Sequence, residues 1–141
     1  MADHWRGIRA TYAGGDRIEM RVRGHVIHAD QPAEEGGGDT APTPTEIFVA
    51  GLAGCIAYSA ERFLRRHRLP AEGLSVGCDY EWEENPHRIG GISITVEVPG
   101  LTEERRVAFT RMVEHCTVHH TLIQPPQIVM TVRSARSGAA A

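Results

Sequence analysis

Hydrophobic and polar residues alternate in several short segments of the chain, and this alternation predicts half-buried β-strands. The predicted strands cover residues 5–12, 17–28, 74–82, 92–98 and 128–132. Turn-forming residues separate them, with Gly14-Gly15 after the first strand and Asn85-Pro86 between the third and fourth. The segments 74–82 and 92–98 are therefore expected to form a hairpin.

The clearest helix signal begins at Thr43. Thr43 is expected to be the N-cap, Pro44 fits the first helical position, and Glu46 completes a capping box. The helix is expected to run to about Arg68, a length of roughly 35 Å at about 1.5 Å per residue. Because the middle of this helix is small or apolar on all sides, we expect a second subunit to cover part of it.

A second helix is expected to begin after Thr102, with Glu103 and Glu104 in its first turn, and to end near Cys116. The predicted order is β-β-α-β-β-α-β, which is typical of the α+β class. We expect a single domain over residues 1–133 and a disordered tail over residues 134–141.

Composition narrows the function classes. The chain has 141 residues, 41% of them apolar, and a net charge of -3, which gives no general electrostatic attraction to nucleic acid or anionic membranes. The longest apolar stretch, 47–60, is too short to span a bilayer and is expected to be a buried helix. The N-terminal residues lack the pattern of an export signal, so we expect no membrane association and a cytoplasmic location. Cysteines there are more often catalytic, metal-binding or inert than crosslinked.

The three cysteines lie in different settings. Cys55 lies in the apolar helix, Cys116 lies in a more polar segment, and Cys78 shares a strand face with Val76 and Tyr80. Each of them can be a small buried hydrophobe, and this interpretation is preferred for Cys78. The spacing of Cys55 and Cys116 does not show that they meet.

Histidines around Cys116 raise a metal-site alternative. His115 and His119 are four positions apart and would share a helical face, with Cys116 and His120 beside them. Against a metal site, the chain has no C-x-x-C motif and no acidic residue follows closely. The sequence also contains no G-x-S-x-G, Walker A or G-x-G-x-x-G motif.

Two segments resemble the OsmC/Ohr family of osmotically inducible and organic hydroperoxide resistance proteins. Residues 43–55, TPTEIFVAGLAGC, are similar to the family's Pro-x-Glu-Leu segment and the Gly/Ala-rich helix that carries its first cysteine. Residues 116–122, CTVHHTL, are similar to its Cys-Pro-Val-His segment and second cysteine. The resemblance covers most of the chain, from 12 to 132.

The resemblance implies an intertwined homodimer, with long central helices packed between sheets and active sites at the subunit interface. It implies that Cys55 attacks a hydroperoxide as a thiolate, and that Cys116 then forms a disulfide with it. No bound cofactor or metal is implied, because an external dithiol, lipoyl-linked in the hydroperoxide resistance branch, restores both thiols.

Two further residues are candidates through the same resemblance. An Arg in a Gly-Gly-Arg turn assists the cysteine in the hydroperoxide resistance branch, and Arg17 is the best match here, with Arg21 and Arg23 as rivals. The branch's acidic residue aligns with Thr45, so Glu46 is interpreted first as a capping residue and only second as a catalytic partner. Thr117 replaces the usual Pro, which places the chain in the broader OsmC-like group.

The leading hypothesis is a thiol-dependent peroxidase for organic hydroperoxides, with hydrogen peroxide as a further substrate. A small-molecule binding protein, with Cys55 merely packed in the core, is the alternative. A site in which Cys116 and its neighbouring histidines hold a metal is the third hypothesis.

Overall fold

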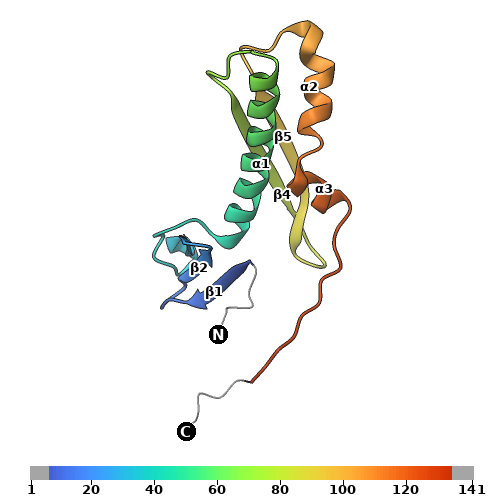
Figure 1. Cartoon of the computed structure of the whole chain (residues 1–141). Coiled ribbons are helices and arrows are strands. Elements are labelled where there is room, and N and C mark those ends of the chain that lie inside the picture. The colour runs from blue at the N-terminus through green and yellow to red at the C-terminus, as the bar shows by residue number, and fades with distance from the viewer. Residues whose placement is uncertain (1–6, 135–141) are drawn as a thin grey trace.

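The computed structural model describes residues 7–134, and these form two antiparallel sheets and three α-helices (Figure 1). The strands are β1 (Ile8–Tyr12), β2 (Ile18–Val22), β3 (His25–Ala29), β4 (Ser75–Glu83) and β5 (Arg88–Glu97). The α-helices are α1 (Pro44–Arg66), α2 (Arg106–Val113) and α3 (Thr117–Ile123), and short 3₁₀ helices cover Ala33–Glu35 and Glu103–Arg105. The predicted α+β class is confirmed.

The N-terminal sheet has the order β1-β2-β3. The single strand predicted over residues 17–28 is wrong, because the chain reverses at Arg23-Gly24 and Val22 pairs with His25. Arg23 takes a left-handed φ of 54°, which this tight turn requires. Of the first predicted strand, Trp5 and Arg6 lie outside the described residues, and β1 accounts for the rest.

Helix α1 begins as the sequence predicts. The Thr43 hydroxyl accepts the backbone N–H of Glu46 at 3.1 Å, and the Glu46 carboxylate accepts the N–H of Thr43 at 2.8 Å. Both halves of the capping box are therefore present. The helix ends at Arg66, two residues before the predicted end, and Arg68 adopts a left-handed φ of 56°.

Strands β4 and β5 form the predicted hairpin, and α1 packs along it with α2 and α3 close by (Figure 1). One side of α1 is buried. The buried residues follow helical spacing and are Val49, Leu52, Ile56, Ala60, Phe63 and Leu64. Phe63 meets Phe109 of α2 edge to face, with ring centroids 5.4 Å apart. These contacts make the core of the molecule.

The second predicted helix ends earlier than expected, and a further helix that was not predicted follows it. A 3₁₀ turn follows Thr102, whose side chain makes no capping hydrogen bond, and α2 ends at Val113. The backbone then leaves the helical conformation at Cys116, with φ -74° and ψ 146°, and Cys116 becomes the N-cap of α3. The predicted position of Cys116 at a helix end is therefore wrong, since it begins the next helix.

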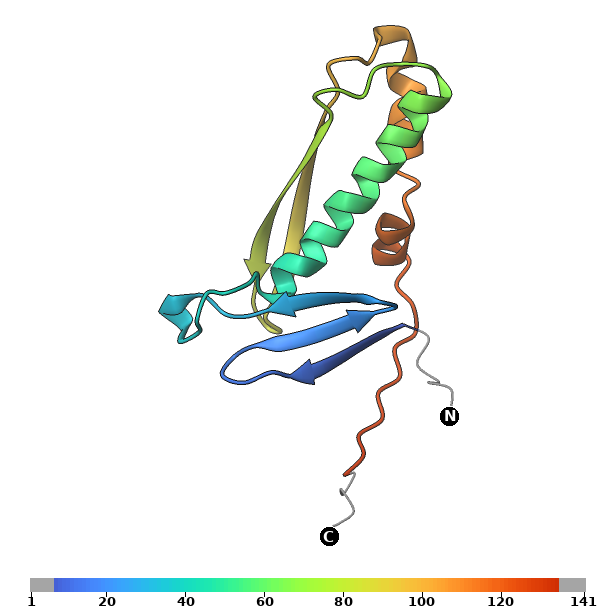
Figure 2. The same cartoon turned by 60° about the vertical axis from the view of Figure 1, so that its left-hand side comes forward.

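The last predicted strand is not formed among residues 7–134. Residues 128–132 are extended but pair with no strand that the structure describes, and both views show this segment running away from α3 (Figures 1 and 2). A strand needs a neighbouring edge for its backbone N–H and C=O groups, and the described part of the chain offers none beside this segment. The predicted tail over residues 134–141 lies outside the described residues except for Ser134.

The N-terminal sheet lies at the beginning of α1, whereas the β4–β5 hairpin lies along the helix (Figure 2). Within one chain, α1 therefore packs against one sheet rather than between two. Among the described residues, α1 is the one helix long and apolar enough to cross a membrane. Its buried side against the hairpin and its capping box are typical of the core helix of a soluble domain.

Candidate active site

Cys55 lies in the middle of α1, at the boundary between the buried face of the helix and its exposed face. Its neighbour Ile56 is only 3% exposed and packs in the core, while Cys55 itself is half-buried. Adding a Cβ at Gly51 or Gly54 would meet no atom within 4 Å, so the small residues leave this part of the helix open. Cys55 is thus a thiol at the edge of the core, not inside it.

Cys116 is more deeply enclosed. It is 2% exposed and packs in a cluster with Leu52 and Ile56 of α1. Its Sγ accepts the backbone N–H of His119 at 3.2 Å, so sulfur takes the place that a Ser or Thr oxygen usually has at an N-cap.

The two thiols lie near each other. Cys55 packs against the cluster that contains Cys116, and it is near enough to raise the pKa of the Cys116 thiol. Both are free cysteines, with no disulfide between them. Residues far apart in the sequence therefore form a thiol pair where α1 meets the beginning of α3.

Burial raises the pKa of the Cys116 thiol, and the nearby Cys55 raises it further. The N–H of His119 partly offsets this rise, because its hydrogen bond stabilises the thiolate. Cys116 is therefore held mainly as the neutral thiol.

Cys78 lies on β4, apart from this pair. It is half-buried on the strand face that also carries Val76 and Tyr80, as predicted. Burial and the charge of Asp79 raise the pKa of its thiol. Cys78 has no place in the thiol pair.

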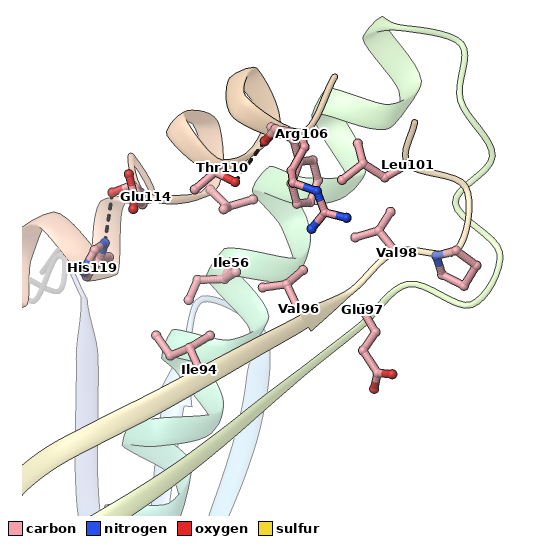
Figure 3. Close-up of a pocket in the computed structure, with 13 residues that line it drawn as sticks. Ile56, Ile94, Val96, Glu97, Val98, Leu101, Arg106, Thr110, Glu114 and His119 are labelled. Atoms are coloured by element: carbon pink, nitrogen blue, oxygen red, sulfur yellow. Dashed lines mark hydrogen bonds between the residues drawn. The ribbon is translucent and has the colours of Figure 1, made fainter. Parts of the chain in front are cut away.

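A groove of about 660 Å³ lies beside the thiol pair, between α1, α2 and β5 (Figure 3). Its walls are mostly apolar, with Arg106, Glu97 and Glu114 at its edges. Ile56 and Val113 line the groove and also contact the cluster around Cys116. Val96 does the same, so the groove and the cluster around Cys116 share three side chains.

Arg17 and Glu46 are held by their own turns. The Arg17 guanidinium donates to the carbonyl oxygens of Ala13 at 3.1 Å and Gly14 at 3.4 Å. Glu46 is engaged by the capping box. Arg17 lies in the turn between β1 and β2, and Glu46 lies in the first turn of α1. The assisting roles predicted for them stay predictions.

The histidines near Cys116 do not converge as metal ligands. Because residues 114–116 leave the helix, His115 and His119 do not share one helical face, and that prediction is wrong. The His115 Nδ1 lies 3.1 Å from the His120 Nε2, while the His119 Nδ1 lies 2.9 Å from the Glu114 carbonyl oxygen. Over residues 7–134, no three His, Cys, Asp or Glu side chains are grouped to hold a metal ion.

Comparison with known proteins places the chain in a family. The model of the family described as OsmC-like protein matches residues 36–131, more than half of the chain. The chain belongs to the OsmC family. The matched residues include α1, the β4–β5 hairpin and both cysteines of the pair, so the sequence resemblance is confirmed. No protein of curated function matches the chain in sequence.

Solved OsmC-like structures share the fold. An osmotic stress induced and detoxification response protein from Psychrobacter arcticus matches with a TM-score of 0.74 and 19% identity, over 85% of this chain and 90% of that one. An OsmC-like protein from Mycoplasma pneumoniae matches with a TM-score of 0.70 and 18% identity, over 88% and 91% of the two chains. An organic hydroperoxide resistance protein OsmC from Legionella pneumophila has a TM-score of 0.63 and 19% identity, over 86% and 91%. At these identities the likeness establishes the OsmC fold.

Sequence reasoning missed the part that His119 has in the site. It weighed this residue only as a metal ligand, yet the structure shows its backbone and its ring contacting the residues around Cys116. The spacing Cys-x-x-His was the available signal, because an N-cap side chain bonds the N–H three residues later.

Proposed function

We propose that this OsmC protein is a thiol-dependent peroxidase that reduces organic hydroperoxides, and hydrogen peroxide as well, with Cys55 and Cys116. The observation that carries the proposal is the proximity of these two thiols, with Cys55 packed against the core cluster that contains Cys116. The neighbour named an organic hydroperoxide resistance protein, which shares the fold, supports the same substrate class.

The exposure of the two thiols supports the proposed order of action. Cys55 is half-buried and Cys116 is 2% exposed, so an oxidant meets Cys55 first. The Cys55 thiolate attacks the outer peroxide oxygen, an S–O bond forms and the O–O bond breaks. The alkoxide that leaves takes up a proton to become the alcohol, and Cys55 becomes a sulfenic acid.

Cys116 completes the cycle. Its sulfur attacks the sulfenic sulfur of Cys55, the S–S bond forms, and the S–O bond breaks to release water with the thiol proton. An external dithiol, such as a lipoyl group, then reduces the disulfide by exchange through a mixed disulfide. The cycle needs no bound cofactor, because all electrons pass through sulfur.

Arg17 and Glu46 complete the proposed site in the roles that the family resemblance assigns. A cation beside Cys55 would stabilise its thiolate, and Arg17 is the proposed cation. To act in this way, Arg17 must exchange its hydrogen bonds to Ala13 and Gly14 for a contact with the site. Glu46 would hold that guanidinium in addition to capping α1.

We further propose that the protein is a cytoplasmic homodimer. Large apolar side chains are exposed on α1 and on the N-terminal sheet, including Phe48 at 46%, Tyr58 at 59% and Tyr12 at 74%. A second copy would cover these surfaces, and it would supply the second sheet that α1 lacks.

A thiol count after oxidation tests the peroxidase. Reduced protein treated with a slight excess of cumene hydroperoxide is expected to keep one of its three thiols, Cys78, with a Cys55–Cys116 linkage found by peptide mapping. Cys55→Ser should abolish peroxide consumption, whereas the matched control Cys78→Ser should retain it. Three unchanged thiols in the wild-type protein would instead favour a small-molecule binding protein on the same fold.

A further inference from the structure

Cys116 lies in the short segment between α2 and α3, where it caps the start of α3. Helix α2 ends at Val113 and α3 begins at Thr117, so the three residues between them belong to neither helix. The position of the Cys116 sulfur therefore depends on contacts outside a helix interior. Both histidines of α3 contact this segment. The His120 N–H donates to the Cys116 carbonyl oxygen at 3.0 Å and its ring contacts the His115 ring, whereas His119 contacts Glu114 and the Cys116 sulfur.

His119 contacts the segment at two points. Its backbone N–H donates to the Cys116 Sγ at 3.2 Å, and its ring Nδ1 lies 2.9 Å from the backbone oxygen of Glu114 (Figure 3). A carbonyl oxygen can only accept, so the Nδ1 carries the hydrogen. The ring joins the end of α2 to the first turn of α3, and the amide joins that turn to the sulfur.

Small displacements of the Cys116 sulfur are expected to affect its reaction with Cys55, because the site is tightly packed. Cys116 packs with Leu52 and Ile56, with 2% of the residue exposed, so its sulfur has little room to approach Cys55 from another direction. Displacements of about 1 Å can slow a reaction between held groups by up to about a hundredfold. A resolving thiol that moves away leaves the Cys55 sulfenic acid open to a second peroxide, which oxidises it to the sulfinic acid.

We propose that His119 is a positioning residue for Cys116, and that its ring-to-carbonyl hydrogen bond sets the rate at which the Cys55–Cys116 disulfide forms. This inference rests on the proposed thiol mechanism and adds a residue to it. His119 acts through Cys116 and takes no part in the attack on the peroxide.

His120 provides the matched control. It is the next residue in α3, but its ring bonds the ring of His115 at 3.1 Å and does not contact the Glu114 carbonyl or the Cys116 sulfur. Removing the His120 ring changes the same helix by a similar volume and leaves the bridge of His119 intact.

The experiment compares His119→Ala, His119→Asn and His119→Gln with His120→Ala. An Asn amide nitrogen occupies about the place of the His Nδ1 and can donate to Glu114, whereas a Gln nitrogen extends to the place of the Nε2. Each reduced variant receives a pulse of cumene hydroperoxide, and mass spectrometry gives the ratio of the Cys55–Cys116 disulfide to the Cys55 sulfinic acid. The rate of Cys55 oxidation and the melting temperature are measured in parallel.

We expect His119→Ala and His119→Gln to lower the disulfide ratio on the order of tenfold at an unchanged rate of Cys55 oxidation. His119→Asn should restore the ratio, and His120→Ala should match the wild type. The inference is overturned if His119→Ala keeps the wild-type ratio, or if Asn and Gln behave alike. If His119→Ala does not fold, the disulfide ratios of His119→Asn and His119→Gln test the inference instead. A wild-type protein that forms no disulfide would overturn the proposed function itself, which separates the two failures.

Discussion

At the scale of single residues, the two thiols of the pair differ in their surroundings more than in their chemistry. Cys55 projects from a helix whose small neighbours leave it half-open, while Cys116 is enclosed by core residues. Burial favours the neutral thiol and exposure permits the thiolate, because only the charged form loses hydration on burial. The proposed division into an attacking and a resolving thiol rests on this difference.

This difference predicts how Cys116 titrates. In a Cys55→Ser, Cys78→Ser double variant, Cys116 is the only thiol, and burial, the largest cause of its raised pKa, remains. We expect its pKa to stay above the ordinary thiol value, followed by the ultraviolet absorbance of the thiolate. Because the folded state holds this proton more tightly, stability should be full below the ordinary pKa and fall as the pH rises through the folded value. An ordinary pKa would show that the sulfur is not enclosed.

At the scale of elements, some local signals were predictable, and the long-range contacts were not. The capping box of Thr43 and Glu46 involves only neighbouring residues, so the sequence alone placed the start of α1. The turn at Arg23-Gly24 was missed, because alternating apolar residues continue on both sides of it. The cap at Cys116 was missed because Cys is not among the usual N-cap residues. The thiol pair was expected only from the family resemblance, since spacing does not show which helices pack together.

The loop between β3 and α1 is held together by one buried carboxylate, that of Asp30. Asp30 is 1% exposed, and its oxygens accept the N–H of Gln31 at 2.8 Å and both the N–H and the hydroxyl of Thr40, at 3.0 and 2.6 Å. The loop also needs Gly37, where a Cβ would collide with the Gln31 backbone oxygen. The Thr40 hydroxyl is the largest cause that lowers the pKa of Asp30 from 3.8 to about 2.

Asp30→Asn is therefore expected to lower the melting temperature at pH 7, because an amide N–H₂ would face donors where the carboxylate oxygen accepts. The folded pKa lies below the unfolded one, so this stabilisation is present above about pH 4 and lost as the pH falls through about 2. Thermal unfolding between pH 7 and 2 should show a shallower acid dependence in the variant. Glu34→Gln, an exposed carboxylate of the same loop, is the control and should change neither quantity. Equal melting temperatures for Asp30→Asn and wild type would contradict the role of Asp30.

At the scale of the whole molecule, a single chain leaves apolar residues with the pattern of a strand exposed. Residues 128–132 have the alternation of a strand, yet Ile128, Met130 and Val132 are 80%, 83% and 87% exposed. The N-terminal sheet has open edges at β1 and β3, and the β4–β5 sheet has only two strands. Two-stranded hairpins are marginal alone, and open edges invite pairing with another chain. Exchange of the C-terminal segment between two copies would complete a sheet in each.

We therefore expect the wild-type protein to have a native mass near twice the 15.5 kDa of one chain. Met130→Glu should shift the mass toward that of one chain, because pairing would bury a carboxylate without a partner. Ser134→Glu, which adds the same charge just beyond the apolar run, should leave the dimer intact. Light scattering during size-exclusion chromatography measures the native mass of the wild-type protein and of both variants. A wild-type protein of one chain's mass would contradict the dimer. A dimeric Met130→Glu would place the contact elsewhere, because a buried, unpaired charge costs several kcal/mol or more.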